Sequence, residues 1–297
     1  MNALLSSRLD HLTAWSYRAG WWIVRHAPEP VVTATLMRLA DRTWSRRGRA
    51  VVQLERNLAH ARPQASADEL RELSRAAMRS YLRYWGEVFR LPRWSGDDLR
   101  ERIIPHDDHR MRDPLGAGRG VVAALPHMGN WDLAGAWACA EDMPVTTVAE
   151  RLRPESLYRD FLRYRQSLGM TVLLLTGGPP TVPLLEARLR AGGLVPLMAD
   201  RDLSRTGLTV PLLGASARLP AGPAKLAQRT GARLLPVSAS YDSDARMHLW
   251  FHEPVEVGDG ADGVRAATAA VADAFSTAIR RDPADWHMLQ RVFVDEA

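Results

Sequence analysis

The feature that most constrains the fold is an alternation of short apolar runs with helical segments after residue 119. Apolar runs of strand length occupy residues 121–125, 145–149, 171–175, 194–199 and 233–239. Segments with helical spacing lie between them, at residues 131–140, 155–168, 182–190 and 220–229. Strands that alternate with helices in this way predict an α/β fold, in which a central, mostly parallel sheet is flanked by helices.

The first hundred residues lack this alternation and have helical spacing instead. Ser66 and Glu69 have the spacing of a capping box, which predicts a helix that begins there and ends before Pro92. The same helix carries a stripe of arginines at Arg71, Arg75, Arg79 and Arg83. Such a stripe is usually a solvated face, and the alternative is a surface that meets phosphate groups.

The remaining patterns complete the domain. Residues 248–257 predict one further strand, and residues 264–279 have the apolar spacing of a closing helix. No internal repeat or low-complexity linker interrupts the chain. We therefore expect a single domain over residues 1–297, with a helical N-terminal layer at residues 1–100 and an α/β core at residues 119–297.

The charge of the chain comes almost entirely from arginine. Lysine and arginine number 39 against 34 acidic residues, a net charge of +5, yet Lys225 is the only lysine. Arginine binds phosphate through a planar fork, which suggests a nucleic acid, an anionic membrane or a phosphorylated cofactor as partner. Arginine-rich codon usage explains the same count without any partner. Cys139 is the only cysteine, so no intrachain disulfide can form.

The N-terminal segment has the residues of a membrane-surface helix. Leu9, Leu12, Trp15, Ala19, Trp22 and Ile23 recur at helical spacing. With the arginines nearby, this pattern favours a helix lying in an anionic membrane interface, or a helix packed on the protein's own core. Early charges argue against a signal peptide, and glycines and prolines at 177–180 interrupt the longest uncharged run, so we expect no transmembrane helix.

The first candidate chemistry follows the strand at residues 121–125. His127 comes just after this strand, Gly129 allows a tight turn, and Asn130 can cap the next helix. Asp132 then falls in the first helical turn and can face back toward His127. A carboxylate bonded to one imidazole nitrogen leaves the other free to accept a proton, so this pair is a candidate general base for a hydroxyl nucleophile. A purely structural pair is the alternative.

A second polar cluster follows the strand at residues 194–199. Asp200, Arg201 and Asp202 lie there, where ligands bind in open α/β sheets. They can position a polar substrate or a phosphate, and a surface salt-bridge loop is the alternative. No Gly-x-Ser-x-Gly elbow, Walker loop or Gly-x-Gly-x-x-Gly fingerprint occurs. The histidines at 106, 109, 248 and 252 lack a convincing set of metal ligands, so we expect no metal.

These segments resemble a known family. The His127-x4-Asp132 element is similar to that of the glycerolipid acyltransferases, and its setting resembles the lipid A biosynthesis branch. The chain most resembles the mycobacterial phosphatidylinositol mannoside acyltransferases. The similar segments are residues 81–92 (YLRYWGEVFRLP), 124–132 (ALPHMGNWD), 147–169, 175–178 (LTGG), 197–207, 219–226 and 283–290 (PADWHMLQ).

The resemblance implies an acyl-CoA-dependent enzyme that transfers a long acyl chain, such as palmitoyl, to a mannose hydroxyl of a phosphatidylinositol mannoside. It implies a hydrophobic tunnel in an α/β fold, a peripheral place at the cytoplasmic face of the cell membrane, and no cofactor apart from the donor substrate. His127 is then the general base and Asp132 its orienting partner. Arg165 and Thr206 contact the acyl donor, and Thr206 keeps the hydroxyl of a residue that is often serine.

The same resemblance places an acidic residue in the catalytic site at the end of the strand that precedes residue 200. That residue is usually glutamate in the family, whereas this chain has Asp200, which is one methylene shorter. Three alternatives remain open. The acceptor can be a lysophospholipid or a lipid A precursor, the chain can be a non-catalytic lipid-binding protein, or the arginine stripe can bind nucleic acid, which we do not expect because no base-reading motif accompanies it.

Overall fold

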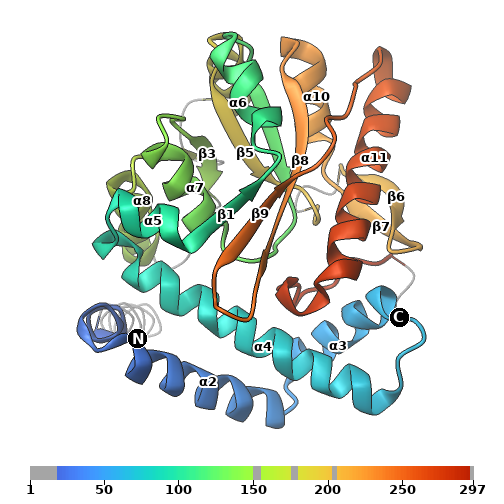
Figure 1. Ribbon diagram of the computed structural model, residues 1–297. Coiled ribbons are helices and arrows are strands. Elements are labelled where there is room, and N and C mark those ends of the chain that lie inside the picture. The colour runs from blue at the N-terminus through green and yellow to red at the C-terminus, as the bar shows by residue number, and fades with distance from the viewer. Residues whose placement is uncertain (1–18, 150–154, 175–179, 203–205, 295–297) are drawn as a thin grey trace, which may run out of the picture.

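A five-stranded sheet forms the centre of the computed structural model (Figure 1), which describes residues 19–149, 155–174, 180–202 and 206–294. In spatial order its strands are β1 (Ile103–His106), β9 (Met247–Phe251), β8 (Arg233–Tyr241), β2 (Val121–Leu125) and β5 (Leu194–Met198). β2 is parallel to β5 and β8, β1 is parallel to β9, and β8 and β9 are antiparallel. The expected α/β fold with a mostly parallel sheet is confirmed.

Two smaller sheets lie outside the central one. β3 (Thr146–Ala149) and β4 (Thr171–Leu174) form a parallel pair, and β6 (Leu208–Leu212) and β7 (Ala215–Leu219) form an antiparallel hairpin. Neither β1 nor the β6–β7 hairpin was predicted from the apolar pattern. β1 is four residues long and contains Pro105, and only alternate residues of the hairpin are buried, so neither presents a continuous apolar run.

Helices cover both faces of the central sheet. Val121, Ala123 and Leu125 of β2 pack into one buried cluster, while Val122 and Ala124 pack into the other, as the two-residue period of a strand requires. The first cluster includes residues of α5 (Gly96–Arg102), α6 (His109–Gly116), α7 (Trp131–Ala140) and α8 (Glu155–Ser167). The second includes residues of α9 (Thr181–Arg190), α10 (Gly222–Thr230) and α11 (Gly260–Arg281).

The N-terminal layer consists of α2 (Glu29–Ser45), α3 (Arg49–Ala61) and α4 (Ala67–Arg90), and α4 passes beneath the sheet in Figure 1. The capping box predicted for α4 is present: Glu69 N donates to Ser66 Oγ over 3.3 Å, and Ser66 N donates to the Glu69 carboxylate over 2.7 Å. A short 3-10 helix (Leu91–Arg93), which contains Pro92, follows α4. α4 contacts both α2 and α3 on one side and α7 on the other, so it connects the layer to the sheet domain.

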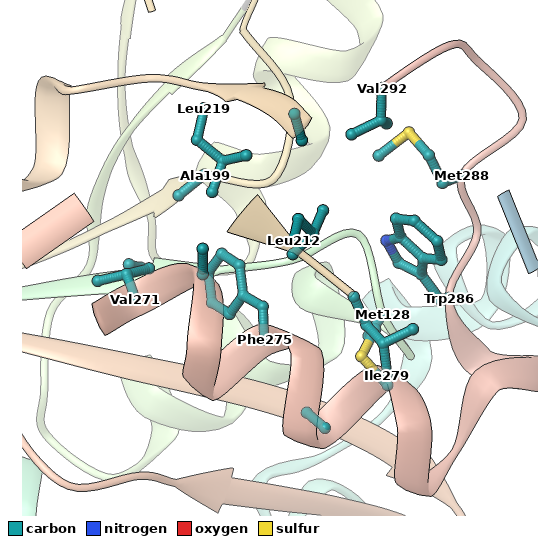
Figure 2. Close-up of a cluster of buried hydrophobic side chains, with 14 of the residues drawn as sticks. Met128, Ala199, Leu212, Leu219, Val271, Phe275, Ile279, Trp286, Met288 and Val292 are labelled. Atoms are coloured by element: carbon teal, nitrogen blue, oxygen red, sulfur yellow. The ribbon is translucent and has the colours of Figure 1, made fainter. Parts of the chain in front are cut away.

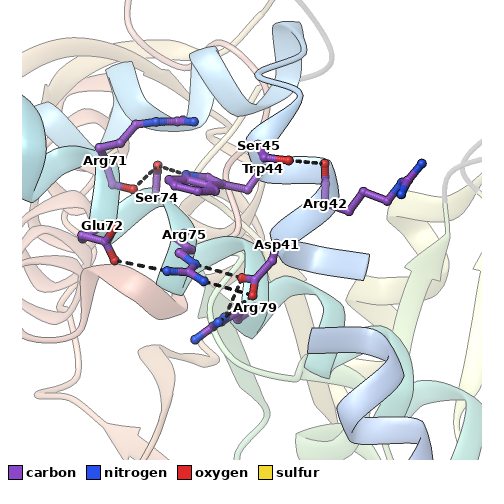
Figure 3. A network of polar contacts seen from close by, with 9 residues as sticks. All are labelled: Asp41, Arg42, Trp44, Ser45, Arg71, Glu72, Ser74, Arg75 and Arg79. Carbon is purple, nitrogen blue, oxygen red and sulfur yellow. Dashed lines mark hydrogen bonds and ion pairs between the residues drawn. The ribbon is translucent and has the colours of Figure 1, made fainter. Parts of the chain in front are cut away.

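Most arginines of the α4 stripe are directed at the neighbouring helices. The Nε atoms of Arg75 and Arg79 donate to Asp41 of α2 over 3.0 and 2.8 Å (Figure 3). Arg71 donates to Glu55 of α3 over 2.5 Å. Hydrogen bonds from both arginines hold the pKa of Asp41 well below its ordinary value. Three of the four arginines therefore connect α4 to α2 and α3 through ion pairs, while the side chains of Arg75 and Arg79 stay partly exposed to solvent.

The large apolar side chains near the N-terminus differ in their exposure to solvent. Trp21 packs against Phe89 and Tyr164, and its Nε1 donates to the Phe89 carbonyl over 3.2 Å. Trp22 and Ile23 are instead 63% and 58% exposed. Leu9, Leu12 and Trp15 lie outside the described residues. Among the helices that the structure describes, none is both long and apolar enough to cross a membrane.

A C-terminal core joins three distant parts of the chain (Figure 2). Phe275 and Ile279 of α11, Leu212 of β6, Met128 and Trp286 are all buried in one cluster. Met128 follows β2, and Trp286 lies in the segment after α11 and the short 3-10 helix Pro283–Asp285. Because Met128 and Trp286 form an antiparallel bridge, the loop after β2 and the C-terminal segment are held together as a unit.

Candidate active site

His127 and Asp200 are brought together by the register of two parallel strands. Leu125 of β2 pairs with Met198 of β5, so the residues two positions beyond each partner lie side by side at the carboxyl ends of the strands. His127 Nδ1 lies 2.6 Å from Asp200 Oδ1, and the His127 backbone N–H donates to Asp200 Oδ2 over 2.8 Å. Aspartate reaches the imidazole in this chain, so the extra methylene of glutamate is not required for the contact.

The environment of Asp200 keeps it a carboxylate. Its side chain is fully buried, and Oδ2 accepts a third hydrogen bond, from Trp286 Nε1 over 3.0 Å. Burial favours a raised pKa, but the charge of His127 and the hydrogen bonds from His127 and Trp286 outweigh it, and the pKa of Asp200 lies below its ordinary value. The Trp286 ring is fixed in the C-terminal core (Figure 2), so its N–H is held in place.

An ionised Asp200 sets the tautomer of His127. A carboxylate only accepts hydrogen bonds, so Nδ1 of the neutral imidazole carries the proton and Nε2 carries the lone pair. Within the described residues Nε2 has no hydrogen-bond partner, and the His127 side chain is 26% exposed and lines a cavity. The arrangement is that of a general base ready to accept a proton.

Asp132 lies elsewhere than expected, which corrects the prediction that it faces His127. Its Oδ1 accepts from Arg165 Nε over 2.7 Å, and its Oδ2 accepts from the Tyr84 hydroxyl over 3.0 Å. The reason is the helix start: Asn130 is the N-cap of α7, with its side chain accepting from Leu133 N over 3.0 Å. Asp132 thus occupies the first turn of α7, where it meets α4 and α8, and the imidazole contact falls to Asp200.

Asp132 and Arg165 form a buried ion pair. The Asp132 side chain is 3% exposed and that of Arg165 is 21% exposed. Burial favours a lowered pKa for Arg165, but the charge of Asp132 and its hydrogen bonds outweigh this, so the pKa of Arg165 is raised. Arg165 lines the same cavity as His127. Asp132 therefore fixes a cavity-lining cation, and contact of Arg165 with an acyl donor remains a prediction.

We expect Asp132→Ala to lower the free energy of unfolding by about 3–5 kcal/mol, because it leaves the Arg165 charge buried without a partner. Urea unfolding followed by circular dichroism measures this. Asp97→Ala is the matched control, since Asp97 pairs with Arg100 over 2.8 Å on the surface, where such a pair contributes about 0–1 kcal/mol. Equal stability losses in the two variants contradict the buried role of Asp132.

Asn130 is itself held by a buried acidic group. Its Nδ2 donates to Glu87 Oε2 of α4 over 2.8 Å, and the Tyr241 hydroxyl donates to the same oxygen. Burial raises the pKa of Glu87 to about 7, although both hydrogen bonds oppose the rise. The loop between β2 and α7 is thus tied to α4 as well as to the C-terminal segment.

The cavity beside His127 has a volume of about 1180 Å³, which exceeds the range of roughly 300–1,000 Å³ found for most small-molecule sites. One group of lining residues is apolar and comes from α7 and the central strands: Leu125, Trp137, Val237, Leu249 and Phe251. Another group is polar: Arg49, Gln53, Arg201, Asp202, Gln290 and Arg291. Such a cavity suits a ligand with a long apolar part and an anionic or hydroxylated part.

The other predicted site residues are placed as follows. Arg201 lines the cavity next to Asp200, and its buried Nε has no hydrogen-bond partner among the described residues. Thr206 is exposed and is not among the described residues that line the cavity. His106 and His248 contact each other over 2.9 Å. In the described part of the chain, no group of three or more potential ligands is arranged for a metal ion.

Sequence reasoning missed Trp286 and Tyr84 as parts of the site. The only signal for Trp286 was its place in the similar segment at residues 283–290, because a single indole in an irregular segment has no periodicity to detect. Tyr84 is buried on the face of α4 that packs against the core, and its hydroxyl reaches Asp132. Burial and the charge of Asp132 raise the pKa of Tyr84 well above its ordinary value.

Comparisons with known proteins identify the family of this chain. The profile of the family described as bacterial lipid A biosynthesis acyltransferase matches residues 4–294. A phosphatidylinositol mannoside acyltransferase of Mycolicibacterium smegmatis is 45% identical over 291 residues, which cover 96% of this chain and 94% of the relative. A protein of the same name from Mycobacterium tuberculosis is 45% identical over 283 residues, covering 94% of this chain and 87% of the relative. The chain therefore belongs to the bacterial lipid A biosynthesis acyltransferase family and is an acyltransferase of glycolipid synthesis.

Proposed function

We propose that the protein transfers a long acyl chain, such as palmitoyl, from acyl-CoA to a mannose hydroxyl of a phosphatidylinositol mannoside. The two relatives carry that acceptor in their names and match nearly the whole chain. The observation that carries the proposal is the free Nε2 of His127, held by Asp200 at the wall of a large, partly apolar cavity. The proposed place of action is the cytoplasmic face of the cell membrane, with the protein bound peripherally.

The chemistry follows from the tautomer. Nε2 of His127 takes the proton from the mannose hydroxyl while that oxygen attacks the thioester carbonyl. A new C–O bond forms, and the carbonyl becomes a tetrahedral oxyanion. Asp200 stabilises the imidazolium through the Nδ1–H bond. When the oxyanion collapses, the C–S bond breaks, the ester is released, and His127 returns the proton to the coenzyme A thiolate.

The oxyanion needs hydrogen-bond donors, and the local backbone does not offer them at residues 127–130. The N–H of His127 bonds to Asp200, that of Met128 to Pro126 O, and that of Gly129 to Asp285 O. The N–H of Asn130 bonds to a methionine sulfur. Arg201 lines the cavity without an acidic partner in the described residues, so we assign it as the donor to the oxyanion.

The proposal is tested with labelled palmitoyl-CoA, offered in parallel with a phosphatidylinositol mannoside and with a lysophospholipid. The expected result is labelled acyl-mannoside. Label on the lysophospholipid alone keeps the mechanism and overturns the acceptor. Release of free palmitate alone overturns acyl transfer to either lipid. Tight lipid binding with no turnover supports a non-catalytic lipid-binding protein instead.

Membrane binding is expected through the exposed apolar side chains near the N-terminus. Substituting both Trp22→Ser and Ile23→Ser removes apolar area that is worth about 1.5–3 kcal/mol per side chain on full burial. We expect sedimentation with anionic phosphatidylglycerol vesicles to weaken by about tenfold or more. The matched control is Val182→Ser with Leu184→Ser, which removes similarly exposed apolar area from α9. Equal vesicle binding by both double variants contradicts a specific N-terminal contact.

A further inference from the structure

A second histidine lies beside the catalytic one. The bridge between Met128 and Trp286 is antiparallel, His287 N donates to His127 O over 2.8 Å, and Gly129 N donates to Asp285 O over 3.0 Å. In this hydrogen-bond pattern His127 and His287 are cross-strand neighbours, and their side chains leave the ladder on the same face. Both line the cavity.

The tautomer of His287 is determined by its partners. The Ser80 hydroxyl donates to Asp285 Oδ1 over 2.5 Å, and Asp285 Oδ2 accepts from Tyr241 N over 2.8 Å. A hydroxyl has one proton, so Ser80 Oγ can only accept from His287 Nε2, which lies 2.9 Å away. Nε2 therefore carries the proton of the neutral ring, and Nδ1 carries the lone pair.

That lone pair is buried and unused. His287 is 5% exposed, and Nδ1 has no hydrogen-bond partner in the part of the chain that the structure describes. Burial, together with the charge of His127, lowers the pKa of His287 to about 3, so the ring stays neutral at neutral pH. A buried acceptor without a partner is unfavourable. Because the ring that carries this nitrogen belongs to the lining of the cavity, a ligand bound there can supply the missing hydrogen-bond donor.

We propose that Nδ1 of His287 accepts a hydrogen bond from a second hydroxyl of the acceptor sugar, while His127 takes the proton of the hydroxyl that is acylated. This inference rests on the proposed function and adds a residue that recognises the sugar. Two acceptor nitrogens on neighbouring positions match a sugar ring, which carries several hydroxyl donors. His287 thereby favours a sugar over an acceptor with a single hydroxyl, because only the sugar can satisfy both nitrogens.

Two substitutions of His287 test the roles of its two ring nitrogens separately. His287→Gln keeps an N–H donor at the ε position for Ser80 but has no acceptor at the δ position. His287→Asn places an amide oxygen where Nδ1 lies. We expect His287→Gln to raise KM for the phosphatidylinositol mannoside about tenfold, with KM for palmitoyl-CoA and the Tm little changed. We expect His287→Asn to restore most of the acceptor affinity.

Deoxy-mannoside acceptors identify the hydroxyl concerned. For the wild type, loss of the hydroxyl that His287 binds should raise KM about tenfold, whereas the same loss should have no further effect in His287→Gln. The assignment is overturned if the effect of His287→Gln on KM and the effect of removing a hydroxyl multiply for every deoxy sugar tested. It is also overturned if His287→Gln raises KM for palmitoyl-CoA and leaves KM for the acceptor unchanged. If the wild type acylates mannosides but the expected KM effects are not observed, the contact between His287 and the sugar is overturned and the proposed function stands. If the wild type acylates no mannoside, both are overturned.

Discussion

His127→Ala should lower kcat for acyl transfer on the order of 10²–10⁴-fold, which is the usual contribution of a positioned general base. The structure gives the reason: Nε2 of this imidazole is the acceptor free at the cavity wall, because Nδ1 is held by Asp200. Binding of acyl-CoA should change little, since the substitution removes a proton acceptor and leaves the apolar lining intact. Steady-state transfer from labelled palmitoyl-CoA measures the effect.

The control for this variant is another histidine. His109 is exposed at the start of α6 and does not line the cavity, so His109→Ala should keep wild-type kcat. Thermal unfolding of both variants establishes that they remain folded. A folded His127→Ala protein with full activity removes the base assignment.

Asp200→Asn should lower kcat on the order of 10³-fold, although the side chain has nearly the same shape. Oδ2 accepts from two N–H groups, those of the His127 backbone and Trp286, and an amide oxygen is required there to satisfy them. The amide NH2 then faces His127 Nδ1 and donates to it. The imidazole proton is forced onto Nε2, which can no longer accept a proton from the substrate.

Asp200→Glu separates charge from geometry. It keeps a carboxylate, so we expect its kcat to fall less than that of Asp200→Asn, and thermal unfolding of the two variants shows whether either change disturbs the buried site. An Asp200→Asn enzyme as active as the wild type contradicts the role of Asp200. An Asp200→Glu enzyme less active than Asp200→Asn shows that size matters there more than charge.

The overall architecture could be predicted because its signals are local. Apolar runs such as residues 121–125 and the capping box at Ser66 depend only on neighbouring residues, and the structure confirms both. The β6–β7 hairpin escaped prediction because only alternate residues face the core. The ion pairs of the α4 arginines were not predicted because their partners, such as Asp41, lie on another helix.

Several residues of the candidate site could be named from the sequence, but the contacts between them could not. His127 and Asp200 were both recognised at strand ends, yet Asp132 was expected to contact the imidazole because it lies five residues away in sequence. The observed contacts are set by two features of the fold. The β2–β5 register brings Asp200 to His127, and the position of Asp132 in the first turn of α7 brings it to Arg165 of α8. The place of His287 beside His127 depends on a third feature, which is the bridge between the C-terminal segment and the loop after β2.

The most direct test of the catalytic account is the tautomer of His127, read from long-range ¹H–¹⁵N correlations of the histidine rings at a pH where the imidazole is neutral. The spectrum of His127→Ala identifies which of the nine histidines gives the signals. The account predicts a protonated Nδ1 and an unprotonated Nε2 in the wild type, with the order reversed in Asp200→Asn. A wild-type His127 protonated on Nε2 contradicts it, because that nitrogen then has no lone pair with which to accept the substrate proton.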